Sequence, residues 1–198
     1  MDAAINLQIP DWLVETAGSG DLSLSSDEER MSFVIGLARD NIRRGTGGPF
    51  AAAVFECGGS RPAACGVNMV VTANCAVAHA EIVAIMLACA GLGVYDLSQG
   101  PAPGGYELFS STDPCAMCLG AVPWSGVKRL VCGADGADAE AAGFDEGAKP
   151  IDWEAQLIRR GIRVCRHVCR TEAAAVLDEY AADGGIIYNG RQSAASAE

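Results

Sequence analysis

The stretch that decides the fold is YELFSSTDPCAMCLGAVPWSGVKRLVC, residues 106–132. Its two apolar ends, 106–110 and 127–132, predict strands. Between them, Asp113 as N-cap and Pro114 at the first helical position predict the start of a helix. A helix that links two strands in this way implies a right-handed crossover between parallel strands.

The alternation of strands and helices continues on both sides of this stretch. We expect strands at 50–55, 64–71 and 162–168 and helices at 9–16, 152–160 and 171–182, with a further helix beginning at Ser26. The first two strands are joined by turn residues and predict an antiparallel hairpin. A helix that begins at His79 and stops at Gly91 is apolar almost all round, which predicts that it is buried against the sheet. The pattern therefore predicts an α/β fold, a three-layer α/β/α sandwich around a mixed five-stranded sheet.

The chain length fits one domain with short extensions. The sequence has 198 residues, of which 50% are hydrophobic and 20% charged, a balance typical of a folded globular protein. We expect an N-terminal extension (1–25), one folded domain (26–183) and a C-terminal tail that is a candidate lid (184–198).

The charge of the chain argues against a polynucleotide partner. The formal net charge is -11, which repels phosphate backbones unless basic residues gather locally. The one such stretch contains Arg159, Arg160, Arg163, Arg166 and Arg170. A spaced run of this kind is more often a solvated helix and strand edge. We therefore expect small-molecule ligands and no nucleic acid.

Cysteine usage and hydropathy indicate a cytoplasmic location. The nine cysteines are odd in number and scattered, and the N-terminus lacks the basic start and apolar core of a signal peptide. The longest apolar run, 82–90, is too short to span a bilayer. We expect no membrane association, and cysteines that are core thiols or metal ligands.

Two short segments carry residues that bind zinc in proteins. One contains His79 and Glu81, and the other contains Cys115 and Cys118. The cysteines are three residues apart, so both thiols lie on one face of a first helical turn, where the helix dipole favours thiolates. His79 and Glu81 are two residues apart, so within a helix their side chains would point in different directions. Both can reach one metal ion only if that ion lies beyond the start of their helix. The spacing therefore predicts one zinc ion per chain, where two helix N-termini meet.

Three protein ligands leave one zinc position for water, whose pKa zinc lowers to near neutrality. Glu81 is then a candidate proton shuttle, which takes a proton from that water and passes it to a ring nitrogen and to the departing amine. His-x-Glu followed by Pro-Cys-x-x-Cys is the mark of zinc nucleobase deaminases.

Other interpretations of these segments remain open. A Cys-x-x-Cys pair alone could be redox-active or structural, and a structural zinc site requires a fourth Cys or His. His167, the other histidine, lies in a predicted late strand without a partner at zinc spacing, whereas seven other cysteines could supply a fourth thiolate. The positions of both segments at helix starts favour catalytic zinc.

At these residues the chain resembles the cytidine deaminase superfamily, and more closely its guanine deaminase branch. The resemblance covers 31–180 and includes, beyond the zinc segments, residues 47–50, Asn68, Trp124 and the Ala-Gly-Phe-Asp-Glu segment at 142–146. That last segment discriminates best, because all branches share the zinc motif.

The resemblance implies roles for further residues. Asn68 would hydrogen-bond the ring edge that carries carbonyl and nitrogen acceptors, with a turn asparagine as the alternative. Phe50 and Phe144 would line the pocket, although plain core packing explains Phe50 equally well. Trp124 would be a pocket or interface residue. The resemblance also implies a second acid in the site, which would be Glu146 or, as the alternative, Asp145. Tyr188 would be the aromatic residue of the lid.

The function implied is the hydrolytic deamination of guanine to xanthine with release of ammonia. Ammeline-like aminotriazines share the donor and acceptor pattern of guanine and stay open as substrates. The alternatives are a tRNA adenosine deaminase or a nucleoside deaminase of the same fold, and a catalytically silent zinc-binding scaffold. The family also implies a homodimer, in which C-terminal segments could be exchanged.

Overall fold

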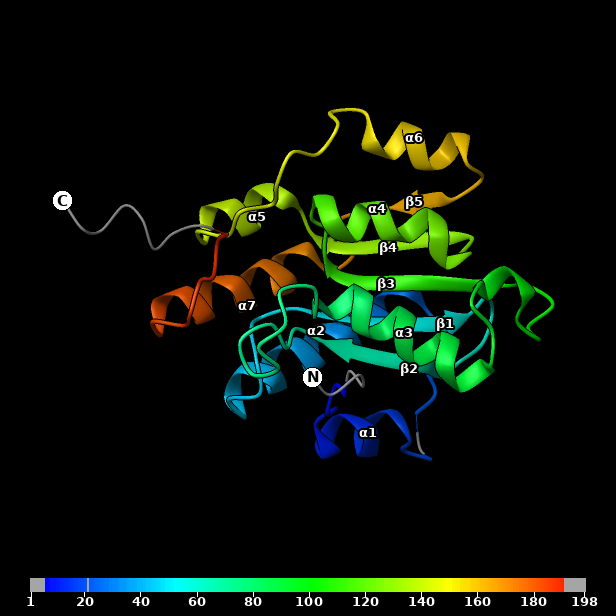
Figure 1. The fold of residues 1–198 in the computed structure, drawn as a ribbon, viewed down its shortest axis with the longest axis horizontal. Helices are drawn as coiled ribbons and strands as arrows, with labels where there is room; N and C mark the ends of the chain where they lie inside the picture. The colour runs from blue at the N-terminus through cyan, green and yellow to red at the C-terminus, as the bar shows by residue number, and fades with distance from the viewer. Residues whose placement is uncertain (1–5, 21, 191–198) are drawn as a thin grey trace, which may run out of the picture.

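The computed structural model describes residues 6–20 and 22–190 of the chain (Figure 1). The strands are β1 (Ala51–Glu56), β2 (Pro62–Val67), β3 (Tyr106–Thr112), β4 (Arg129–Ala134) and β5 (Arg163–Cys165). The helices are α1 (Asp11–Ala17), α2 (Asp27–Arg43), α3 (Ala80–Leu92), the 3₁₀ helix η1 (Leu97–Gln99), α4 (Ala116–Ser125), α5 (Gly136–Ala141), α6 (Trp153–Arg159) and α7 (Arg170–Ala182). Parts of the predicted extension and tail, residues 1–5, 21 and 191–198, lie outside the described residues.

The five strands form one mixed sheet in the order β2-β1-β3-β4-β5. β1 is antiparallel to both β2 and β3, whereas β3, β4 and β5 are parallel. The predicted hairpin and the predicted crossover through α4 are therefore confirmed. This topology brings the carboxyl ends of β3 and β4 to the same edge of the sheet (Figure 1).

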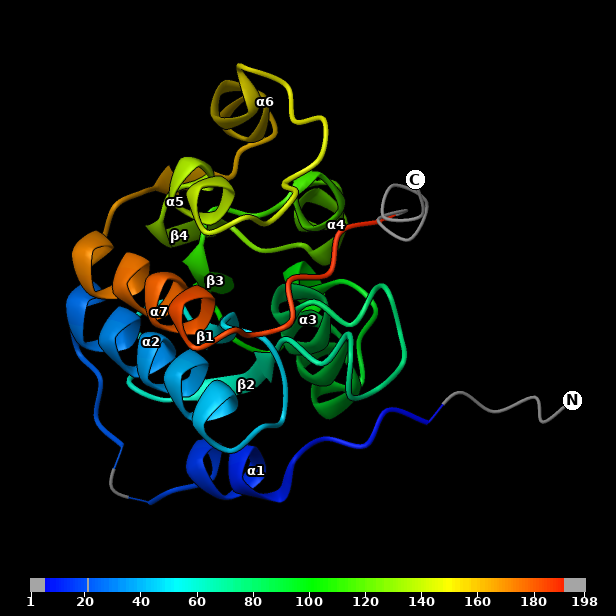
Figure 2. The same ribbon diagram turned by 90° about the vertical axis from the view of Figure 1, so that its left-hand side faces the viewer.

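Helices cover both faces of the sheet, which confirms the predicted three-layer sandwich (Figure 2). Successive side chains of a strand point to opposite faces, and β1 shows this plainly. Its Ala51, Ala53 and Phe55 belong to the core beneath α2 and α7, while Ala52 and Val54 belong to the core beneath α3 and α4. The site described below lies at the end of this second core.

Several element boundaries differ from the sequence prediction. β2 ends at Val67 instead of continuing to residue 71, because Asn68 and the turns after it carry the chain to the start of α3. β5 ends at Cys165, so the prediction that His167 lies in a strand is wrong. His167 has a φ of 66°, a left-handed conformation that ends a strand. α3 continues past Gly91 and stops at Gly93, whose φ is 68°.

The helix after β3 begins later than predicted. Its N-cap is Cys115 and not Asp113, since Asp113 is still extended and donates its backbone N–H to Ala134. The Asp113 carboxylate accepts hydrogen bonds from Arg166 and from the backbone N–H of Gly136, so it is not free to cap a helix. The two predicted zinc ligands of this segment, Cys115 and Cys118, consequently stand at the N-cap and in the first turn.

The stretch Ala80–Gln99 is long and apolar enough, by length and composition alone, to cross a membrane. Its regular helix α3 has 13 residues and ends at Leu92. α3 packs on β1 and β2 with Val83 and Ala84 fully buried, as a core helix does.

α5 is a short helix that the sequence analysis did not predict.

Candidate active site

Two helix N-termini meet at the predicted metal site. His79 is the N-cap of α3 and Cys115 is the N-cap of α4, while Cys118 lies one turn further along α4. His79 Nδ1 and Cys115 Sγ are 3.5 Å apart. One ligand atom from each of the three residues lies within 4.8 Å of the other two. The geometry expected from the sequence spacing is present.

Close packing of α3 on the sheet sets the position of His79. A Cβ atom at Gly66 of β2 would collide with the backbone of Ala80 and Ala84, so only glycine lets the first turn of α3 approach the strand this closely. Before the helix, Met69 donates its backbone N–H to the carbonyl of Ala78. These contacts hold the N-cap residue from both sides.

The three donors fit a zinc ion with one open position. All nine cysteines are free, and Cys118 is buried while His79 and Cys115 are partly buried. A hydrogen bond from Cys118, together with His79, lowers the pKa of Cys115 to about 4 against the opposing effect of burial. A cluster that stabilises a thiolate without a metal suits a Zn²⁺ ion, and a set of one histidine and two cysteines is found in catalytic zinc sites.

Glu81 lies beside the ligands in the first turn of α3. Its side chain is 6% exposed. Burial raises the pKa of Glu81, the negative charge of Cys115 raises it further, and His79 acts in the opposite direction. A carboxyl group whose proton affinity is raised in this way suits a residue that accepts and returns a proton.

A cavity of about 40 Å³ opens onto these groups. Phe50, just before β1, and Phe144, after α5, meet edge to face on its wall, with ring centroids 4.8 Å apart. Tyr188 from the C-terminal tail packs against Phe144 and against His79, with centroid distances of 6.5 and 6.0 Å. Aromatic side chains therefore surround the space next to the metal ligands.

Asn68 lines the same cavity and is almost fully buried. Its backbone carbonyl accepts a hydrogen bond from Asn41 Nδ2, which also binds the carbonyl of Gly48. A Cβ atom at Gly47 would collide with the Asn68 carbonyl, and one at Gly48 would lie 3.2 Å from Asn68 Oδ1. The glycine pair thus allows this loop to pass directly over Asn68.

Both neighbouring acids line the cavity, but Glu146 is buried whereas Asp145 is exposed. Glu146 is 5% exposed, and Lys149 Nζ donates to its Oε2 at 2.8 Å. Burial raises the pKa of Glu146 to about 7, against the opposing effect of Lys149. Asp145 is exposed and accepts a hydrogen bond from the backbone of Gly147, so it closes a local turn.

Comparison with known proteins supports the geometric reading. Residues 24–134 match the family model described as "Cytidine and deoxycytidylate deaminase zinc-binding region". The chain belongs to this deaminase family.

Two guanine deaminases and a purine complex are among its relatives. Guanine deaminase of Bacillus subtilis (strain 168) is 40% identical over 122 residues, which cover 61% of this chain and 73% of that protein. The structure of guanine deaminase from Nitrosomonas europaea has 46% identity and a TM-score of 0.87, and covers 92% of this chain and 98% of that one. NE0047 in complex with 2,6-diaminopurine has 46% identity and a TM-score of 0.88, and covers 96% of this chain and 100% of that one.

Trp124 does not reach the cavity of this deaminase. Its side chain is 84% exposed on the outer side of α4, where it borders a groove formed with α6. Trp124 therefore does not line this cavity within a single chain, and its role as a pocket or interface residue stays a prediction. The α-helical position explains the result, because Cys118 and Val122 occupy the buried face of α4.

Three arginines of the run form ion pairs, Arg159 with Asp152 and the two described next, whereas Arg160 and Arg163 form none among the described residues. Arg166 binds Asp113 and Glu154, and Arg170 binds Asp135 and Asp138. Arginines whose charge is matched in this way do not form a free basic surface, which agrees with the predicted solvated edge.

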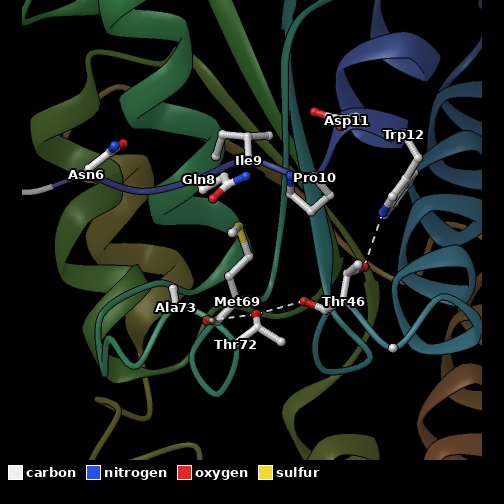
Figure 3. A pocket seen from close by; sticks show the side chains of 11 residues that line it. Asn6, Gln8, Ile9, Pro10, Asp11, Trp12, Thr46, Met69, Thr72 and Ala73 are labelled. Atoms are coloured by element: carbon white, nitrogen blue, oxygen red, sulfur yellow. Dashed lines mark hydrogen bonds between the residues drawn. The ribbon is translucent and has the colours of Figure 1, made fainter.

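A larger cavity of the deaminase lies elsewhere (Figure 3). It measures about 650 Å³ and is bounded by the segment before α1 and by the loops around Thr46 and Thr72. Trp12 Nε1 donates to Thr46 Oγ1 at 3.2 Å along its wall. It contains none of the zinc-binding residues, and its size alone does not make it the reaction site.

Sequence analysis missed three residues beside the cavity. Thr112 and Asp113 line it, and the hydroxyl of Thr112 has no hydrogen-bond partner among the described residues. Lys149 contacts Glu146 from outside. The spacing of Glu146 and Lys149, three residues apart with opposite charge, was the available signal for this last contact.

Proposed function

We propose that this chain converts guanine and water into xanthine and ammonia. The observation that carries the proposal is the convergence of three metal-binding donors with two buried carboxylates, Glu81 and Glu146, at one aromatic-lined cavity. The similarity to two guanine deaminases supports guanine over other aminated rings.

His79, Cys115 and Cys118 would hold the zinc ion, which would act as a Lewis acid and activate water for attack on the ring. Glu81 takes a proton from the attacking water and passes it to the adjacent ring nitrogen. It then delivers the second proton to the departing amine, so that ammonia leaves. Its buried position beside the ligands and its raised pKa both suit this double transfer.

Ring recognition falls to residues on the opposite side of the cavity. The Asn68 amide offers a donor and an acceptor to the edge of the base. Glu146 presents a carboxylate that accepts hydrogen bonds from ring N–H and amino groups. Phe50 and Phe144 provide apolar surface for the flat ring.

The C-terminal tail serves as a lid. A cavity of about 40 Å³ holds one or a few water molecules but no purine. Tyr188 forms part of its wall and accepts a hydrogen bond from Asn68, whereas Asn189 is partly exposed and Gly190 is exposed. Displacement of this segment admits the base, and its return excludes water.

The outer face of α3 and α4 suits a second copy of the chain. Met86 is 52% exposed on α3, and Met117 and Trp124 are exposed on α4, which packs beside α3. Large apolar side chains gathered on two adjacent helices are typical of protein interfaces. We propose a homodimer through this face, with Trp124 as an interface residue.

We propose a cytoplasmic location, since nine free thiols persist in a reducing compartment. Of the alternatives, a tRNA adenosine deaminase agrees poorly with a net charge of -11 and paired arginines. The retention of a buried Glu81 argues against a silent scaffold. A nucleoside deaminase and an ammeline deaminase remain to be separated from the proposed function by assay.

Ammonia release from guanine by the zinc-loaded protein tests the proposal. Ammeline, adenine, cytosine, guanosine and cytidine serve as parallel substrates, and Glu81→Ala serves as the blank. Rapid release from guanine that is absent in the variant is the expected result. Turnover of another amine without guanine turnover would retain the reaction type and reject the substrate. Inactivity on all rings despite bound zinc would reject the proposal.

A further inference from the structure

Lys149, which is partly buried beside the cavity, has no part in the chemistry described so far. Lys149 is one of only two lysines in the chain, the other being Lys128. Its amine donates to Glu146 Oε2 at 2.8 Å, with side-chain exposures of 15% for Lys149 and 5% for Glu146. Removing an ammonium group from water costs free energy unless the group is paired with an opposite charge, here the Glu146 carboxylate.

The contact leaves the two oxygens of Glu146 in different environments. Oε2 is occupied by Lys149, whereas Oε1 has no hydrogen-bond partner among residues 6–20 and 22–190. Glu146 lines the cavity together with Glu81 and Cys115. An oxygen that is not bonded within the protein is the one available to a ligand.

The space for the lysine amine is provided by Gly136 at the start of α5. A Cβ atom at this position would lie 2.7 Å from Lys149 Nζ and 3.7 Å from Glu146 Oε2. The first distance is too short for an unshifted contact, so any side chain at residue 136 displaces the amine. The absence of a side chain at Gly136 therefore leaves room for the Lys149 amine. That amine in turn holds the Glu146 carboxylate.

We propose that Lys149 is a positioning residue, which holds Glu146 Oε2 and so directs Oε1 toward the N–H groups of the bound base. This inference rests on the proposed function of Glu146 in ring recognition. Lys149 does not touch the base and acts only through the carboxylate. If orientation of the base limits the reaction, a misplaced recognition group lowers the turnover rate more than it weakens binding of the base.

A double-mutant cycle tests the proposal. We expect Lys149→Met to lower kcat for guanine at least tenfold, which is about 1.4 kcal/mol, with a smaller change in KM. In a Glu146→Ala background the same substitution should have little further effect, because the carboxylate on which Lys149 acts is gone. Lys128→Met, at the exposed lysine, is the matched control and should retain full activity.

Gly136→Ala supplies a second, independent variant in case Lys149→Met folds poorly. It removes no functional group and should reduce kcat in the same direction by displacing the amine. Gly36→Ala on α2, where a Cβ would meet nothing within 4 Å, is its control. Zinc content and melting temperature of each variant report on folding separately from turnover.

The outcomes distinguish this inference from the proposed function. Additive losses in the double variant, or a normal kcat in both Lys149→Met and Gly136→Ala, would overturn the positioning role while guanine turnover by the wild type stands. If the wild type deaminates another ring, the proposed substrate fails and the same cycle is read on that ring. Coupling between residues 146 and 149 there would still support the positioning role.

Discussion

Asn68 Nδ2 donates a hydrogen bond of 2.7 Å to the hydroxyl of Tyr188, which lies 120 residues later in the chain. The same hydroxyl is 3.3 Å from His79 Nε2. If Nδ1 of His79 binds the metal, its Nε2 carries the proton and donates to Tyr188. The proposed lid residue thus contacts the proposed ring-recognition residue Asn68 and the candidate metal ligand His79 at once.

Tyr188→Phe removes this hydroxyl and keeps the aromatic ring. We expect KM for guanine to rise about two- to tenfold, since a net hydrogen bond contributes about 0.5–1.5 kcal/mol. Steady-state kinetics of ammonia release measures the change. Tyr95→Phe, at a tyrosine that is 84% exposed, is the control. An unchanged KM would show that the hydroxyl does not order the site.

Glu81→Gln keeps the shape of the side chain and removes its ability to carry a proton. We expect a loss of about a thousandfold in kcat, the scale of general acid–base catalysis, with one zinc per chain retained. Ammonia assays and metal analysis measure the two quantities. Glu28→Gln, on the exposed side of α2, should remain active. Substantial activity in Glu81→Gln would assign proton transfer to another group.

Removal of zinc should abolish activity and lower the melting temperature. The metal would link two helix N-termini, because the candidate ligand atoms of His79, Cys115 and Cys118 lie within 4.8 Å of one another. A ligand present at about a thousand times its Kd stabilises a protein by about 4 kcal/mol. Chelation followed by zinc addition, monitored by calorimetry and turnover, checks both effects. Full activity in the metal-free protein would be incompatible with the proposed chemistry.

The raised pKa of Glu146 predicts a pH-dependent stability. This pKa is about 7 in the folded chain and near 4.5 in a free side chain, so the folded state binds more protons between these values. The free energy of unfolding therefore falls as pH rises through this window. Between pH 5 and 8 we expect the free energy of unfolding of the wild type to fall by about 2 kcal/mol more than that of Glu146→Gln. Urea unfolding at both pH values measures the difference, and parallel losses would contradict it.

Met86→Asp places a charge on the exposed apolar face of α3. We expect the mass in solution to fall from two chains to one, because an unpaired charge at an interface core opposes association. Light scattering after gel filtration measures the mass. Asp178→Asn, on α7 on the other side of the sheet, is the control. A wild type that is already monomeric would exclude the proposed dimer.

The candidate metal site, the first hairpin and the parallel strands joined by a crossover follow from local patterns in the sequence. Cys115 and Cys118 are three residues apart, and that spacing alone places both thiols on one turn. The direction of the Trp124 side chain cannot be predicted from the neighbouring sequence, because a tryptophan on an apolar helix can face the core or the solvent. Lys149 lies in a loop without periodicity, and only the folded chain shows that Gly136 makes room for it.

The groups proposed to carry the reaction and those proposed to recognise the base come from different kinds of segment. His79, Glu81, Cys115 and Cys118 stand at the starts of two core helices, whereas Asn68, Glu146 and Tyr188 stand on connecting loops and the tail. Loops accept substitution and insertion far more readily than core helices do. A library of variants confined to residues 68–77, 143–150 and 185–190 should consequently yield enzymes for new aminated rings while the proton-transfer machinery is inherited intact.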